Sequence, residues 1–165
     1  MRKEDFTEVE WQAIREAPHW AGLAVMVAGS SGVLGSLKEA FAAGHATASG
    51  KQHPSELIRS LSIRQESEAV DRGIRAQIAQ RSGTGAGIQE WVAETALTRL
   101  RSAGRVMSSK PKESADAYRQ WVLDIAKRVT EAAKEGSVLG FGGTRVSAAE
   151  EAMIRKIGAA LEGIE

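Results

Sequence analysis

Apolar side chains recur along most of this chain at intervals of three and four residues, which is the spacing of one face of an α-helix. The clearest run has charged residues between its apolar positions, which are Tyr118, Trp121, Val122, Ile125, Val129 and Ala132. The same spacing predicts further helices over residues 7–17, 18–28, 36–48, 54–81, 88–100 and 147–164. Since no segment alternates convincingly between apolar and polar positions, the sequence predicts an all-α fold. We expect one domain over residues 1–165, a compact bundle of six or seven helices.

Three of the predicted helix starts carry a Ser/Thr-x-x-Glu capping box, in which the hydroxyl and the carboxylate each accept a hydrogen bond from a backbone N–H of the first turn. The boxes are Thr7 with Glu10, Ser36 with Glu39, and Ser147 with Glu150. Phe6 and Trp11 flank the first box as a hydrophobic staple. These pairs predict where the three helices begin.

Two places interrupt the helical pattern. Pro18 has no N–H and its ring crowds the preceding turn, so we expect a break or kink there, with Pro18 opening a second helix. The stripe over residues 54–81 is thin, and it is compatible either with one long helix or with two helices that break near residues 62–65. Its apolar residues Val70, Ile74 and Ile78 are the candidate interface if that face points outward.

The stretch GSVLGFGGTRVSAAEEA, residues 136–152, is rich in glycine and leads into a predicted helix start. Free N–H groups before a helix, with a cation beside them, can hold an anion. The candidate anion-binding residues are Gly142, Gly143, Arg145 and Ser147. Three features favour a structural turn instead: a helix precedes the stretch, the Lys-Ser/Thr ending of a P-loop is missing, and the capping box already uses the helix N–H groups.

The same order of features occurs earlier in the chain. VMVAGSSGVLGSLKEAF and AAKEGSVLGFGGTRVSAAEEAM both run from a helix through a glycine–serine turn and Val-Leu-Gly to Ser-x-x-Glu-Ala, which indicates an internal pseudo-repeat; chance is the alternative, since Ser-x-x-Glu is a common helix start. The pattern resembles the tellurite-resistance TerB family, which is all-helical and built from two related halves. The residues that carry the resemblance are Ser31-Gly32 with Ser36-Leu37-Lys38-Glu39, and Gly136-Ser137 with Ser147-Ala148-Ala149-Glu150.

The resemblance covers about 40 residues and implies a helical stress-response or divalent-metal-associated module. This chain departs from the family at the acidic turn residue that is linked to metal binding, because serine or glycine stands there in both copies. The resemblance therefore does not extend to the family's acidic turn residue.

Composition excludes several chemistries. The chain has 165 residues, a net charge of +1 and no cysteine, which removes disulfides, thiolate metal sites and cysteine nucleophiles. A nearly neutral chain has no general attraction to nucleic acid, so we expect none as a partner. The start lacks the apolar run of a signal peptide, and the longest apolar stretch, WAGLAVMVAG, is too short to span a membrane. We expect a cytoplasmic protein without membrane contact.

Histidine and carboxylate spacing gives little support for a metal site. Glu16 and His19 spell Glu-x-x-His, a ligand motif of di-iron bundles, but those bundles need two such motifs and Pro18 lies inside this one. We interpret His19 as a solvent-facing or helix-junction residue. His19, His45 and His53 have no i, i+4 spacing, and GTGAG at 83–87 follows no strand. We therefore expect no metal, no cofactor and no catalytic residue.

A run of cations and four tryptophans bear on partners. Five cations lie between residues 99 and 112, where they form either a binding patch or a solvated helix end favoured by the helix dipole; they are Arg99, Arg101, Arg105, Lys110 and Lys112. Trp11, Trp20, Trp91 and Trp121 lie on or near apolar stripes and are expected in the core, and one left outside would mark an interface.

These observations favour a non-enzymatic helical interaction or scaffold protein that binds a protein partner or itself. One alternative is a TerB-like module associated with stress or divalent metal. The other is a small-ligand binder or enzyme whose pocket lies between helices.

Overall fold

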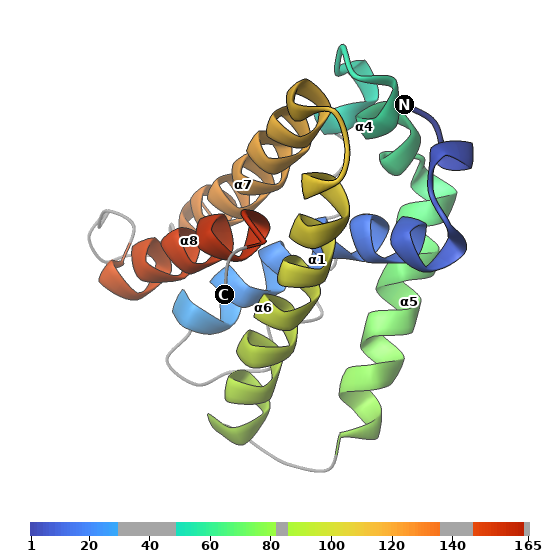
Figure 1. Ribbon diagram of the computed structural model, residues 1–165. Helices are drawn as coiled ribbons and strands as arrows, with labels where there is room; N and C mark the ends of the chain where they lie inside the picture. The colour runs from blue at the N-terminus through green and yellow to red at the C-terminus, as the bar shows by residue number, and fades with distance from the viewer. Residues whose placement is uncertain (30–48, 82–85, 136–146, 164–165) are drawn as a thin grey trace.

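The computed structural model describes residues 1–29, 49–81, 86–135 and 147–163. All regular structure within these ranges is helical, which confirms the predicted all-α class (Figure 1). The elements are the 3₁₀ helices η1 (Lys3–Asp5) and η3 (Ser49–Gln52) and the α-helices α1 (Glu8–Gly29), α4 (Glu56–Leu61), α5 (Arg64–Gln80), α6 (Ala86–Ser108), α7 (Lys112–Glu135) and α8 (Ala148–Leu161). The described part therefore holds six α-helices in one bundle.

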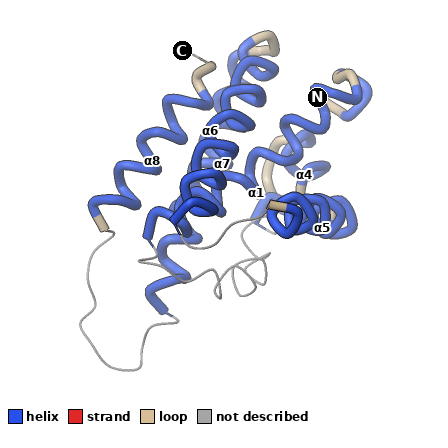
Figure 2. Tube along the Cα trace, turned by 90° about the horizontal axis from the view of Figure 1, so that it is seen from below, coloured by secondary structure: helices blue, strands red, loops and turns tan. Residues whose placement is uncertain are grey.

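Helix α1 is the centre of this bundle. Its second half is apolar on nearly every side, and residues 20–25 are all buried. A helix that is apolar all round needs neighbours all round, and α6, α7 and α8 pack against α1, with α5 crossing it separately (Figures 1 and 2). Trp20 is fully buried and meets the half-buried Trp91 of α6 edge to face, with ring centroids 6.3 Å apart. Trp11 and Trp121 are also buried, so three of the four tryptophans lie in the core.

The break predicted at Pro18 is wrong, because α1 continues through this residue as one helix of 22 residues. Proline removes the N–H that would bond the carbonyl of Ile14. The hydroxyl of Tyr118, on α7, donates to that Ile14 carbonyl oxygen at 2.8 Å. The missing helical donor is thus replaced from another helix. Burial raises the pKa of Tyr118 well above its usual value, so its hydroxyl remains protonated and able to donate.

The first helix starts as the sequence predicts. Thr7 and Glu10 form the capping box, with backbone-to-side-chain hydrogen bonds of 3.2 and 2.8 Å. Phe6 and Trp11 contact each other at a centroid distance of 5.9 Å, as expected of the staple. The backbone hydrogen bond of Thr7, followed by its side-chain hydrogen bond, lowers the pKa of Glu10. The box of Ser36 and Glu39 lies outside the described residues.

The alternatives for residues 54–81 are resolved in favour of two helices. Helix α4 ends at Leu61 and α5 begins at Arg64, with the turn at Ser62 and Ile63 between them. Leu57, Ile58 and Leu61 are buried, which anchors α4 in the core.

The C-terminal end of α8 lies against α6 at a glycine. A Cβ placed on Gly104 would lie 2.7 Å from the carbonyl oxygen of Leu161 and 2.8 Å from that of Ala160. Gly163 ends the C-terminal turn with a φ of 70°, a left-handed conformation that suits glycine. Close approach of backbone to backbone therefore sets the spacing between α6 and α8.

Replacing Tyr118 by phenylalanine tests the bond across Pro18. Tyr118→Phe leaves the Ile14 carbonyl buried without a donor, and we expect the free energy of unfolding to fall by about 1–3 kcal/mol. In a Pro18→Ala background the new N–H at position 18 can bond that carbonyl, so Tyr118→Phe should then cost clearly less. Urea denaturation of the four proteins in this cycle gives the coupling. Equal costs in both backgrounds would show that the hydroxyl does not replace the helical donor.

Two glycine-to-alanine changes should act in opposite directions. Gly104→Ala forces α6 and α8 apart and should destabilise the fold by about 1–3 kcal/mol. Gly73, in the middle of α5, has nothing within 4 Å of an added Cβ, so Gly73→Ala should stabilise by about 0.5–1 kcal/mol. Thermal and urea unfolding of both variants measures the difference. A stabilising Gly104→Ala would contradict the close contact.

Candidate functional site

Four polar side chains lie on one face of the core helix α1. Gln12, Arg15, Glu16 and His19 are three and four residues apart on α1, and we name them the polar strip. Arg15 and His19 reach α5, whereas Glu16 reaches Arg99 on α6. The polar strip is therefore bracketed by α5 on one side and by α6 on the other.

The α5 side of the polar strip holds two pairs. Nδ1 of His19 lies 2.7 Å from Oδ1 of Asp71, and both side chains are largely buried. One turn earlier, Nη1 of Arg15 lies 2.5 Å from Oε2 of Glu66. His19 does not face solvent, because its side chain is 6% exposed and is covered by α5; it lies where α1 and α5 meet. Both pairs join α1 to α5.

Glu16 forms the α6 side of the polar strip, and its carboxylate is incompletely bonded. Oε1 accepts from Nε2 of Gln12 at 2.8 Å. Oε2 lies 3.9 Å from Nη1 of Arg99, an ion-pair distance that is too long for a hydrogen bond. Glu16 is 7% exposed and Arg99 is on the surface side, so one carboxylate oxygen is buried beside a cation that solvent can reach.

Several buried polar atoms on α1 and α5 have no hydrogen-bond partner among the described residues. Among the described residues, four such atoms belong to the polar strip or its neighbours on α1 and α5: Nε of Arg15, Oε2 of Glu16, Nε1 of Trp20 and Oγ of Ser67. A buried polar atom that lacks a partner costs free energy, and ordered water or a bound polar group is the usual compensation. The junction of α1, α5 and α6 is therefore the best candidate site in the described chain.

The site's chemistry is that of paired charges. Glu16 and His19 of the Glu-x-x-His motif face different partners, on α6 and α5 respectively. In the described ranges, no three His, Asp or Glu side chains converge in a way that could hold a metal ion.

The glycine-rich candidate site falls largely outside the described ranges, which exclude Gly142, Gly143 and Arg145. Ser147 is described, and its hydroxyl accepts from the backbone N–H of Glu150 at 3.2 Å, while Glu150 accepts from the N–H of Ser147 at 2.7 Å. The predicted capping box is confirmed, and α8 begins directly after Ser147. The remaining positions of the TerB-like pattern, residues 31–39, 136 and 137, also lie outside the described ranges.

The stripe on α5 faces inward. Val70 and Ile74 are buried, and Ile78 is partly buried against the core. The condition for a dimer seam, an outward stripe, is not met, because α5 uses this face to pack on α1.

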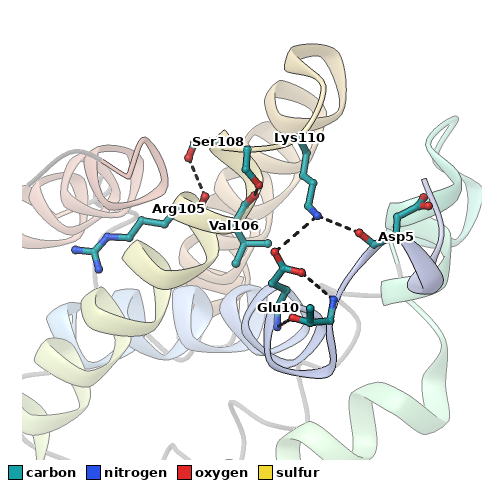
Figure 3. A network of polar contacts seen from close by, with 8 residues as sticks. Asp5, Glu10, Arg105, Val106, Ser108 and Lys110 are labelled. Atoms are coloured by element: carbon teal, nitrogen blue, oxygen red, sulfur yellow. Dashed lines mark hydrogen bonds and ion pairs between the residues drawn. The ribbon is translucent and has the colours of Figure 1, made fainter.

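The run of cations at residues 99–112 is spread over different contacts. Figure 3 shows Lys110, whose Nζ donates to the carbonyl of Asp5 at 3.0 Å and lies 3.7 Å from Oε1 of Glu10. The same ammonium lies 4.5 Å from the centre of the Phe6 ring. Lys112 pairs with Asp116, and Arg99 pairs with Glu16. Each of these three cations therefore has a partner within the fold. Lys110 contacts the N-terminal segment, Lys112 pairs within α7, and Arg99 pairs with α1.

Comparison with protein-family models, with curated proteins and with solved structures finds no match for this chain. No helix in the described ranges combines the length and the apolar character needed to cross a bilayer. The Glu-x-x-His motif contains half of the polar strip, Glu16 and His19, but not Gln12 and Arg15, although all four residues share the three-and-four spacing of one helix face.

Proposed function

We propose that the protein is a non-enzymatic helical interaction protein that binds a protein partner or a second copy of itself in the cytoplasm. The observation that carries this proposal is the use made of its buried ionisable groups. His19 is taken up by Asp71, and Glu16 by Gln12 and Arg99. The contacts with Asp71 and Arg99 join α1 to α5 and to α6, so groups that could perform acid–base chemistry act here as structural links.

The surface offered to a partner lies at the end where α1 and α5 begin. Val9, on the first turn of α1, is 80% exposed, and Ile63, in the turn before α5, is 53% exposed. They are the large apolar side chains that the described chain leaves most open. An ion pair of 3.1 Å between Arg2 and Glu56 brings the N-terminal segment to α4 at this end (Figure 1).

Self-association is tested by size-exclusion chromatography with light scattering at low and high salt. We expect association at high micromolar concentration that is insensitive to salt, since apolar contacts are not screened. Val9→Ser and Ile63→Ser should each weaken the association by roughly tenfold to a hundredfold, as expected when one aliphatic side chain is no longer buried at the contact. Ala159→Ser, an exposed change on α8, is the control.

A monomer at high micromolar concentration in both buffers contradicts self-association and leaves binding to another protein as the form of the proposal. Salt-sensitive retention on heparin or DNA would contradict the apolar mode and favour a role for the cations at residues 99–112.

A second candidate function is the binding of a small polar molecule at the junction of α1, α5 and α6. Nε1 of Trp20 and Oε2 of Glu16 favour it, because they are a buried donor and a buried acceptor that have no hydrogen-bond partner within the described ranges. The ligand would be net neutral and would carry both kinds of hydrogen-bonding group, as a zwitterionic amino acid does.

Thermal melts against a panel of amino acids test this candidate, with divalent cations as the arm for the TerB-like alternative. A ligand at about 100 times its Kd should stabilise the fold by about 2.7 kcal/mol. Glu16→Gln should abolish the shift, and Glu113→Gln, an exposed change in the first turn of α7, should preserve it. A shift that survives Glu16→Gln would place the binding elsewhere.

A further inference from the structure

Helix α5 is attached to the rest of the bundle differently from the other long helices. We propose that α5 is a detachable helix, which leaves α1 as a unit while α4 and the bundle of α1, α6, α7 and α8 stay folded. The proposal does not depend on the function proposed above. It follows from how little apolar surface holds α5, from the polar character of its remaining contacts, and from what borders it at each end.

The apolar anchoring of α5 is shallow. Of its 17 residues only Ser67, Val70 and Ile74 are buried, and one of these is polar. Among the described elements, its main packing is on α1. Helix α7, by contrast, buries large side chains along several turns, including Tyr118, Trp121, Val122 and Ile125. Elements with few buried apolar contacts are the ones that open locally below the free energy of global unfolding.

The remaining contacts between α5 and α1 are polar and imperfect. The pairs of Glu66 with Arg15 and of Asp71 with His19 flank the buried Val70. Nε of Arg15 and Oγ of Ser67 are buried in the same region without hydrogen-bond partners among the described residues. Detachment returns these groups to water, where they are solvated. The cost of exposing Val70 and Ile74 is offset in part by that gain.

The contacts described at the two ends of α5 do not prevent it from moving away from α1. At its start, the turn at Ser62 and Ile63 follows α4, which is held in the core by its own buried leucines and isoleucine. At its end, Arg81 contacts α6 through a cation–π interaction, with its guanidinium 5.2 Å from the Trp91 ring centre. Such an interaction is weak at the surface. Gly73, in the middle of α5, has no close neighbour that requires a glycine, and it lowers the helix propensity of this element.

Detachment would uncover one face of the central helix. The side chains of Arg15 and His19, now covered by Glu66 and Asp71, would face solvent. The surface of α1 on which Val70 and Ile74 pack would be exposed with them. Helix α5 therefore acts as a cover over the α5 side of the polar strip, and its position controls access to a buried charged surface.

The experiment uses a single engineered thiol, which is unambiguous because the chain has no cysteine. Val70→Cys places the thiol under α5, and Val122→Cys places a matched thiol on α7; both valines are buried. Thiol labelling is measured under native conditions and at rising sub-denaturing urea. We expect the Val70→Cys variant to react at least about tenfold faster than the Val122→Cys variant, with a weaker urea dependence, since local opening exposes less surface.

Two further changes separate detachment from a local effect of the cysteine. Adding Asp71→Asn to Val70→Cys should raise labelling several-fold, whereas Glu68→Gln, whose exposed carboxylate pairs with Arg64 of the same helix, should leave it unchanged. Hydrogen exchange of the unmodified protein should show the amides of α5 exchanging before those of α7. Equal protection and equal urea dependence of the two thiols would overturn the proposal, as would acceleration of labelling by Glu68→Gln as large as that by Asp71→Asn.

Discussion

The bundle depends on one hydrogen bond that crosses between helices. Helix α1 passes through the centre of the fold, and Pro18 lies in its middle, where the Ile14 carbonyl loses its helical donor. A buried carbonyl without a donor would be costly. The Tyr118 hydroxyl meets this carbonyl at 2.8 Å and also fixes α7 beside α1. Helix α1 remains continuous through Pro18, and α6, α7 and α8 all pack on it.

The polar strip shows a second constraint on a central helix. Gln12 is exposed and bonds Glu16 on the same helix. Arg15, Glu16 and His19 are mostly buried, so each needs a polar partner from a neighbouring helix. Those partners come from α5 and α6, on opposite sides. The α6 side combines one ion pair with extensive apolar packing, whereas the α5 side combines two polar pairs with the short apolar stripe of Val70, Ile74 and Ile78. The same strip thus holds one helix firmly and another lightly.

Local signals in the sequence were sufficient for the class of fold and for the helix starts at Thr7 and Ser147, because a capping box is made by residues that are close along the chain. The outcome at Pro18 could not be predicted in this way. Its donor comes from Tyr118, a hundred residues further on, and only the packing of α7 brings it there. The role of His19 was missed for the same reason, because Asp71 reaches it from another helix. Val70 and Ile74 followed a visible stripe, but a stripe alone does not say which side of a helix is covered.

The bond across Pro18 also limits the order in which this chain could change over evolutionary time. A proline that arose at position 18 before a tyrosine stood at position 118 would have left a buried carbonyl unpaired, whereas the tyrosine could have come first at little cost. The order of losses is constrained in the same way. The tyrosine can be lost without leaving the Ile14 carbonyl unpaired only after the proline has been replaced. The effect of a substitution at either of these two distant positions therefore depends on the residue at the other.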